Sequence, residues 1–380
     1  MTEIHGHCDE AFTSVRDQFA NNFEQGLELG ASVCVTKDGK TVVDLWGGDA
    51  DRNGRPWEQD TLCNVWSTTK TMSAIVMLML ADRGQIDLDA PVADYWPEFK
   101  ANGKEGVLVR HVLAHTAGLP GWAPPIAVTD LYDQDVLARN FEAQSPWWEP
   151  GTKSGYHLIS QGHLEAEIVR RVTGQTIGTI FREQVAEPLG AEFHIGLPES
   201  EEGKVAELIP PESVGLGELD GTDLDSVAVR AATSCPIKGS EPNTREWRAA
   251  EIPAAGGQGN ARGVARVHSV LANGGSLDGV ELLSEATLER IFEEQSENVD
   301  LVLGAKMRMG IGFGLMNETV PLSANRRSCF WGGWGGSIAV IDVDARISIA
   351  YVMNKMAPEL MGDLRGGTLA ILALMANASS

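Results

Sequence analysis

The sequence predicts an α/β fold in which both ends of the chain, residues 1–85 and 256–380, form one lobe, while residues 86–255 form a mostly helical lobe inserted between them. Segments with β-branched or alternating apolar residues lie near both ends, whereas the middle contains mainly helical and loop-like patterns. The 380 residues, 43% of them hydrophobic, suffice for one catalytic domain with two lobes. A functional site is expected in the cleft between the lobes.

The first 85 residues predict a helix, a β-hairpin, a short strand and a second helix. The first helix, over residues 11–23, is predicted by apolar residues three or four positions apart, at Phe12, Val15, Phe19 and Phe23. Asp38-Gly39 between two β-rich runs is a strong hairpin signal. The apolar run TLCNVW is expected to be a strand that leads straight into the buried helix TMSAIVMLMLADRG.

The last 125 residues return to strand-like patterns after two helices. The helices are NARGVARVHSVLANGG and SEATLERIFEEQ, and the strand-like segments are MGIGFGLMN, SIAVIDVDA and ISIAYVMN. The chain ends in the apolar helix TLAILALMANA. The longest apolar runs fall short of the ~20 residues that span a bilayer, so they predict core helices.

Charge and cysteine content narrow the partners and the compartment. A formal net charge of −23 at pH 7 argues against binding to nucleic acid or to an anionic membrane surface, which both attract basic proteins. The five scattered cysteines predict a reducing compartment rather than a disulfide framework. The N-terminal MTEIHGHCDEAF has no basic or apolar signal region, so a cytoplasmic protein is expected. The oligomeric state stays open, with a homodimer as one option.

The segment NVWSTTKTM contains the strongest chemical signal, a serine followed three residues later by a lysine at the start of an apolar helix. Ser67 and Lys70 would share one helix face, because positions i and i+3 are neighbours. A serine hydroxyl needs a base to become a nucleophile, and burial lowers the pKa of a lysine enough for that role. The helix N-terminus adds free N–H groups that favour an oxyanion. Chance occurrence is the alternative for this motif alone.

Other catalytic and metal-binding patterns are weak. No Gly-x-Ser-x-Gly and no phosphate-binding loop occurs, and the glycines after Gly257 do not fit a dinucleotide fingerprint. His111 and His115 have zinc-helix spacing, but valine stands where such a site needs glutamate. The cluster of His5, His7 and Cys8 is expected to belong to a frayed terminus. We therefore expect no metal and no cofactor.

Two further segments are candidates for the site. Tyr156 follows a turn rich in glycine and proline and is expected to open a helix, from which its hydroxyl could project into a cleft. The glycines of FWGGWGG precede a strand and leave room for backbone to approach a ligand closely. The alternatives are an aromatic residue packed at a helix start and a glycine-rich hairpin corner.

In order and spacing, these elements resemble the serine β-lactamase and penicillin-binding-protein superfamily, and most of all family VIII carboxylesterases, over nearly the whole chain. Ser67-Thr68-Thr69-Lys70 matches the Ser-x-x-Lys motif, and VRHVLAHTAGLPGW is similar to the HT-x-GL segment. Tyr156-His157-Leu158 stands at the Tyr-x-Asn position, and Trp331-Gly332-Gly333 stands at Lys-Thr-Gly in the Trp-Gly-Gly form. The resemblance implies a β-lactamase/DD-peptidase-like fold, with an antiparallel sheet flanked by helices and an inserted helical lobe.

The resemblance also implies roles for these residues. Ser67 would be the nucleophile of an acyl-enzyme mechanism that needs no cofactor. Lys70 and Tyr156 would share the base and acid work, and the division between them stays open. The backbone N–H groups of Ser67 and Trp334 would form the oxyanion hole.

Two departures from the β-lactamase pattern favour a small, uncharged ester as substrate. Leu158 replaces an asparagine and Trp331 replaces a lysine, so neither can make the polar interactions that a β-lactam finds there. Substrate contacts are therefore expected from Leu158, Trp331, Gly332 and Gly333. An apolar acyl or alcohol group is expected to meet Trp122, Trp147 and Trp148 at the cleft mouth, with simple packing as the alternative.

The same machinery allows other activities. A β-lactamase, a D-amino-acid peptidase or an acyltransferase would use the same Ser-Lys-Tyr set. A non-catalytic binding or assembly protein of this fold is a further alternative, although it would not need Ser67, Lys70 and Tyr156 to be intact.

Overall fold

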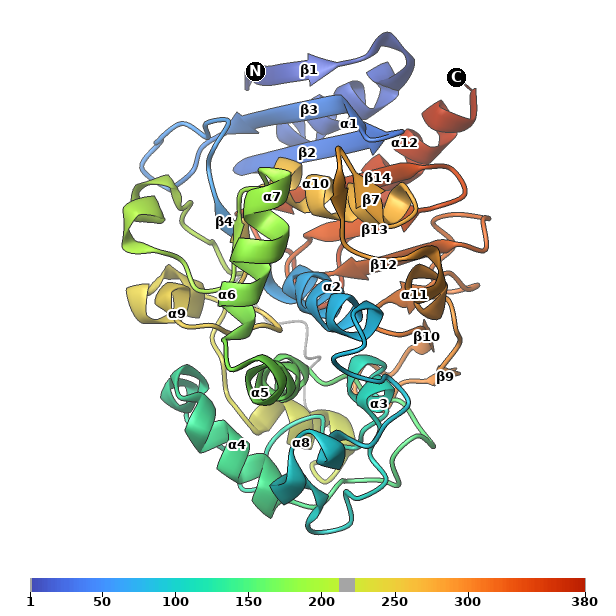
Figure 1. Cartoon of the computed structure of the whole chain (residues 1–380). Helices are drawn as coiled ribbons and strands as arrows, with labels where there is room; N and C mark the ends of the chain where they lie inside the picture. The colour runs from blue at the N-terminus through green and yellow to red at the C-terminus, as the bar shows by residue number, and fades with distance from the viewer. Residues whose placement is uncertain (1, 212–222, 380) are drawn as a thin grey trace.

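The computed structural model describes residues 2–211 and 223–379, and its centre is a nine-stranded sheet (Figure 1). Residues 212–222, which fall in the predicted inserted lobe, lie outside the described part. The strand order is β1-β3-β2-β14-β13-β12-β11-β10-β9, and all pairings are antiparallel. The strands are β1 (Ile4–Cys8), β2 (Gly30–Lys37), β3 (Lys40–Gly48), β9 (Ser296–Val299), β10 (Lys306–Met309), β11 (Gly314–Leu315), β12 (Ser328–Gly332), β13 (Ile338–Asp342) and β14 (Ile347–Met353).

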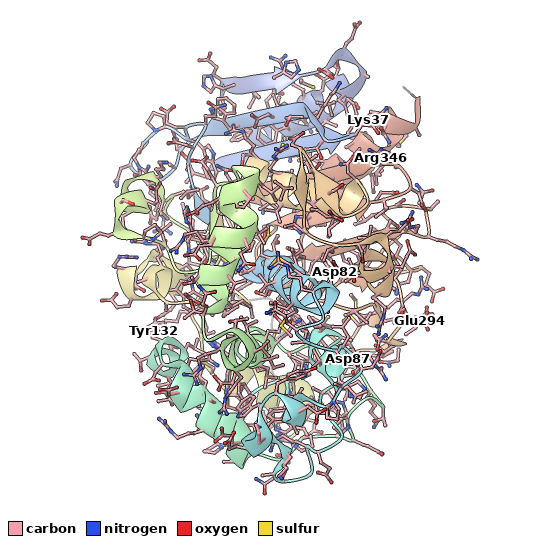
Figure 2. The ribbon with its side chains drawn as sticks, viewed as in Figure 1. Lys37, Asp82, Asp87, Tyr132, Glu294 and Arg346 are labelled. Carbon is pink, nitrogen blue, oxygen red and sulfur yellow. The ribbon has the colours of Figure 1, made fainter. Side chains whose placement is uncertain are left out.

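The two ends of the chain meet where β2 pairs with β14. The predicted hairpin forms β2 and β3, with Asp38 and Gly39 in the left-handed conformation that the tight turn requires. Lys37 pairs with Ile347 across the β2–β14 junction, and Figure 2 shows Lys37 and Arg346 at this corner of the sheet. The predicted antiparallel sheet is confirmed.

Helices cover both faces of the sheet. The terminal helices α1 (Thr13–Glu24) and α12 (Leu364–Ser379) pack together on one face, and α10 (Ala261–Ala272) crosses β2 and β14 on the other (Figure 1). The apolar stripe predicted for the first helix faces inward, since Val15 and Phe19 are fully buried. This layering gives the sheet a core on both sides.

The helix α2 (Thr69–Asp82) lies between the sheet and the remaining helices, and every side chain from Thr69 to Leu80 is buried. A helix that is apolar on all sides belongs inside a core. At its C-terminal end the Asp82 carboxylate accepts hydrogen bonds from Ser284 and Thr287, which begin α11 (Glu285–Arg290) (Figure 2). These contacts fix α2, and hence its first turn, in the middle of the molecule.

The remaining α-helices and strands differ widely in length. The other helices are α3 (Val109–Leu113), α4 (Gln134–Ala143), α5 (Ser160–Thr173), α6 (Ile177–Phe181), α7 (Glu187–Leu189), α8 (Val227–Thr233) and α9 (Arg245–Ala249). Two small sheets contain β4 (Cys63–Asn64), β6 (Gln258–Gly259) and β5 (Phe193–His194), and β7 (Ser276–Leu277) with β8 (Val280–Glu281). The division into lobes at residues 86 and 255 stays a prediction.

Two sequence-based expectations are wrong. The N-terminus is not frayed, because Ile4–Cys8 forms the edge strand β1, paired with β3 from Ile4 opposite Gly47 to Cys8 opposite Val43. The run TLCNVW contributes only the two residues of β4, which pair with β6 outside the main sheet. It cannot extend further as a strand, because the chain turns into a 3₁₀ helix at Trp66–Thr68.

Candidate active site

Ser67 lies in a sharp turn at the mouth of α2, within the 3₁₀ helix Trp66–Thr68. The preceding residue, Trp66, has φ +46°, a left-handed conformation that a bulky side chain rarely adopts. Such strain clusters at functional sites, where the surrounding structure holds it. Here Ser337 Oγ donates to Val65 O at 2.7 Å and lies 2.9 Å from Thr68 Oγ1, which clamps the turn from the β12–β13 side.

Lys70 is fully buried beside Ser67, and its Nζ atom lies 3.1 Å from Ser67 Oγ. The same Nζ donates to the backbone carbonyl oxygens of Leu158 at 2.7 Å and Ala254 at 3.0 Å. Burial holds the pKa of Lys70 well below its ordinary value of 10.5, and Glu165 opposes this shift only when its carboxyl group is ionised. The lysine is therefore surrounded by acceptors, and no carboxylate of the described residues forms an ion pair with it.

Tyr156 lies in the loop before α5 rather than at a helix start, since α5 begins at Ser160. Its ring packs 4.9 Å from His115 and 5.5 Å from Trp331, with Lys70 Nζ 4.8 Å above it. Burial raises the pKa of the Tyr156 phenol, while the nearby Ser67 hydroxyl and Trp331 indole partly oppose this shift. The hydroxyl therefore lies near Ser67, although it forms no hydrogen bond with any described residue.

The turn after β12 brings Gly333 against the Ser67 turn. A Cβ atom at Gly333 would lie 2.2 Å from Val65 O and 3.2 Å from Ser67 N, so only glycine allows this approach. Trp334 follows, with its ring 4.9 Å from that of Trp66. Within the described residues, the backbone N–H groups of Ser67 and Trp334 have no hydrogen-bond acceptor.

A cavity of about 130 Å³ opens beside Ser67 and Tyr156. It is mainly apolar and is lined by Trp66, Ser67, Pro120, Trp122, Tyr156, Leu158, Ile159, Ala231, Ala232, Ser234, Cys235, Ile237, Trp334 and Leu360. No lysine, arginine or carboxylate occurs among these lining residues of the described chain. The cavity therefore suits an uncharged, apolar group next to the serine hydroxyl.

The fold, the site and sequence comparison agree on the family. The Beta-lactamase family model matches residues 19–373. The chain belongs to the beta-lactamase family. It is similar to the crystal structure of a family VIII carboxylesterase, with 44% identity, coverage of 98% of this chain and 100% of that one, and a TM-score of 0.91.

Two other similar proteins match nearly the whole chain. A penicillin-binding protein homolog from Caulobacter crescentus is 38% identical over 98% of this chain and 100% of that one, with a TM-score of 0.91. Esterase/beta-lactamase LipL from Mycobacterium tuberculosis is 33% identical over 99% of this chain and 89% of its own length. The predicted β-lactamase/DD-peptidase-like fold is confirmed.

The residues expected to bind substrate fall into two groups. Trp122 and Leu158 line the cavity, as does Trp334. Trp331, Gly332, Gly333, Trp147 and Trp148 are not among its lining residues. Trp331 instead stacks on His115 at 5.3 Å, and Trp148 packs on Gly155 and donates from Nε1 to Lys153 O at 3.0 Å. These two tryptophans support the Tyr156 loop in this beta-lactamase-family site.

The histidines considered for metal binding have local structural contacts. His111 lies in α3 and accepts a hydrogen bond from Leu108 N, and His115 Nδ1 accepts one from His157 N at 3.2 Å. Burial lowers the pKa of both rings, so they are neutral at pH 7. Among the described residues, no group of three or more His, Cys, Asp or Glu side chains is arranged to hold a metal ion.

Two buried carboxyl groups near the site escaped the sequence analysis. Glu165 on α5 is fully buried, and its Oε1 accepts from Gln161 Nε2 at 2.9 Å. Asp300 lies in the β9–β10 turn and accepts from the backbone N–H of Tyr156 at 2.9 Å. Glu165 could have been noted as a charge between the apolar residues Leu164 and Ala166, whereas no sequence signal marks Asp300.

Glu165 gives a pH-dependent stability that can be measured. Burial raises its pKa from 4.5 to about 8, against the opposing effects of Gln161 and Lys70. The folded protein therefore keeps this proton between about pH 4.5 and 8 while the unfolded chain loses it, so stability falls as pH rises through this window. Glu165→Gln, which mimics the neutral acid, should gain melting temperature relative to wild type from pH 5 to pH 8.

The measurement is thermal unfolding of both proteins at several pH values on one buffer series. Wild type serves as the reference at each pH, which removes the contribution of all other titrating groups. A melting-temperature difference that stays constant from pH 5 to pH 8 would contradict a buried, protonated Glu165.

Proposed function

We propose that this protein is a serine carboxylesterase that hydrolyses short- to medium-chain, uncharged esters through an acyl-enzyme on Ser67. The observation that carries the proposal is the contact of 3.1 Å between Ser67 Oγ and a buried lysine amine at the edge of an apolar cavity. Membership of the beta-lactamase family and similarity to a family VIII carboxylesterase support the same reaction class.

Lys70 is the base that activates Ser67. A neutral amine has two N–H donors and one lone pair, whereas an ammonium ion has three donors. Two backbone carbonyls, of Leu158 and Ala254, accept from Nζ, and the remaining direction faces Ser67 Oγ. Because burial lowers the pKa of Lys70, the lone pair is available there to take the serine proton.

Tyr156 acts as a neutral acid. Burial raises the pKa of its phenol, so the hydroxyl keeps its proton at neutral pH and can donate it to the departing alkoxide. Lys70 Nζ lies 4.8 Å from the centre of the Tyr156 ring, so the lysine ammonium formed on serine attack is close to the site that needs a proton. The neighbouring positive charge also helps the leaving group depart as an alcohol.

The reaction has two halves. In the first, Ser67 Oγ attacks the ester carbonyl, its proton moves to Lys70, and the C–O bond to the alcohol breaks as the alkoxide is protonated through Tyr156. The backbone N–H groups of Ser67 and Trp334 donate to the oxyanion of the tetrahedral intermediate. In the second half, water attacks the acyl carbonyl and gives a proton to neutral Lys70. The Lys70 ammonium returns a proton to Ser67 Oγ as the C–O bond to serine breaks, and the acid product is released.

The cavity favours an ester without charge. Its apolar lining includes Leu158, where β-lactamases offer an amide, and its described residues include no cation for a substrate carboxylate. The roles of Trp122, Leu158 and Trp334 in this proposal are to contact the apolar acyl or alcohol group. LipL carries a double name, esterase and beta-lactamase, so β-lactam hydrolysis is the alternative to be tested.

We also place the enzyme in the cytoplasm. All five cysteines are free thiols, and four of them are buried, which fits a reducing compartment. Among the described helices, none combines the length and the apolar character needed to cross a bilayer.

The role of Ser67 as nucleophile can be tested by substitution. Ser67→Ala should lower kcat for p-nitrophenyl butyrate by at least about 10³-fold, since the acyl-enzyme can no longer form. The matched control is Ser269→Ala, because Ser269 is buried on α10 and is not among the residues that line the cavity. Its kcat should stay within a few-fold of the wild-type value. Substantial activity in Ser67→Ala would remove Ser67 from the mechanism.

A separate prediction distinguishes ester hydrolysis from β-lactam hydrolysis. Leu158 and Trp331 each deprive a β-lactam of a polar interaction worth about 1–3 kcal/mol, so the two together should lower kcat/KM by roughly 30- to 25,000-fold. We expect kcat/KM for a chromogenic cephalosporin to fall far below that for p-nitrophenyl butyrate on one preparation. An equal or higher cephalosporin value would assign the protein to the β-lactamases instead.

A further inference from the structure

The β9–β10 turn makes a set of contacts with the loop that carries Tyr156. Asp300 Oδ1 accepts from Tyr156 N at 2.9 Å, and Leu301 N donates to Ser154 O at 3.0 Å. Ser154 Oγ also donates to Asn298 Oδ1 at 3.1 Å. Three hydrogen bonds thus join the outer edge of the sheet to a loop more than 140 residues earlier in the sequence.

Asp300 is the centre of these contacts. Its side chain is fully buried, and Oδ1 accepts three backbone N–H groups, from Tyr156, Val302 and Leu303. Two of the three close its own turn, which is a common use of aspartate. The third reaches the residue that carries the phenol, and Oδ2 has no partner among the described residues. Burying a carboxylate in this way is costly, so turn formation alone does not account for it.

We propose that Asp300 is a positioning residue for the reaction, which fixes the Tyr156 backbone so that the phenol hydroxyl stays aimed at Ser67. This inference rests on the proposed ester hydrolysis at Ser67. The ring cannot compensate for a displaced backbone, because it is held between His115 and Trp331. A displacement of ~1 Å at a catalytic group can cost roughly 10²-fold in rate.

The carboxylate also acts on the phenol electrostatically. Burial is the largest cause that raises the pKa of Tyr156, and the negative charge of Asp300 raises it further. The titratable groups around the ring are Lys70 on α2, His115 after α3, His157 on the same loop and Asp300 on the β9–β10 turn. Removal of the Asp300 charge should therefore make the phenol more acidic.

The test compares Asp300→Ala and Asp300→Asn with wild type, using the full chain and p-nitrophenyl butyrate. Asp300→Ala should lower kcat by roughly 10- to 100-fold with little change in KM, because the substitution disturbs positioning rather than binding. Asp300→Asn keeps an oxygen that accepts the same three N–H groups, so it should recover most of kcat. Its activity should decline at high pH earlier than that of wild type, because Tyr156 loses its proton more easily.

The matched control is Asp342→Ala. Asp342 is equally buried in the same sheet and accepts from Ser323, Asn325 and Ala345 N, and none of these hydrogen bonds comes from the Tyr156 loop. At a temperature where circular dichroism shows all variants folded, Asp342→Ala should keep kcat within a few-fold of wild type.

The outcomes separate this inference from the proposed function. Loss of activity in Ser67→Ala together with full kcat in Asp300→Ala would overturn only the role of Asp300. An equal kcat loss in Asp342→Ala, or a high-pH decline in Asp300→Asn that coincides with wild type, would overturn it as well. Activity that survives in Ser67→Ala would overturn the proposed function itself.

Discussion

The burial of the Lys70 amine beside Ser67 is the constraint on which the rest of the site depends. A lysine enclosed by backbone carbonyls can be tolerated only if it is neutral or if its donors are all used. Leu158 O and Ala254 O supply two acceptors from two different segments, and Ser67 occupies the third direction. The structure thus gives up stability to keep an amine of lowered pKa next to a serine hydroxyl in a buried environment.

This arrangement requires segments that are far apart in the sequence. Lys70 comes from α2, its carbonyl partners come from the Tyr156 loop and from the segment before β6, and the Ser67 turn is clamped from the β12–β13 turn by Ser337. Behind that last turn, the buried Arg365 donates to Gly335 O at 2.8 Å and pairs with Glu28 at 2.9 Å. The sheet formed by both chain ends therefore serves as the frame that holds the site together.

Local patterns were enough to predict the parts of the fold with strong periodicity or turn chemistry. The Asp38-Gly39 hairpin, the buried α2 and the strands β13 and β14 formed as expected. Short strands were not predictable in this way, because β1, β4 and β11 are held by neighbours rather than by their own residues. The helix predicted for SEATLERIFEEQ ends at Arg290, before the segment that leads into β9.

The same distinction applies to the site. The pairing of Ser67 with Lys70 follows from helix geometry, so the Ser-x-x-Lys motif was enough to predict it. The structure also brings Tyr156 close to both residues. Residues that act through long-range packing gave no comparable signal. Asp300 reaches Tyr156 only because the β9–β10 turn folds back across the molecule, and Trp148 supports a loop instead of lining the cavity.

A measurement of the protonation state of Lys70 tests most directly whether its buried amine is neutral beside Ser67. The protonation state can be measured by NMR titration of protein labelled with ¹³C and ¹⁵N in its lysine side chains, with the Lys70 signal assigned by its absence in Lys70→Met. We expect this signal to titrate well below the ordinary lysine value of 10.5, so that the amine is neutral where the enzyme works. A Lys70 signal that stays in the ammonium form up to about pH 10, like those of exposed lysines, would contradict it.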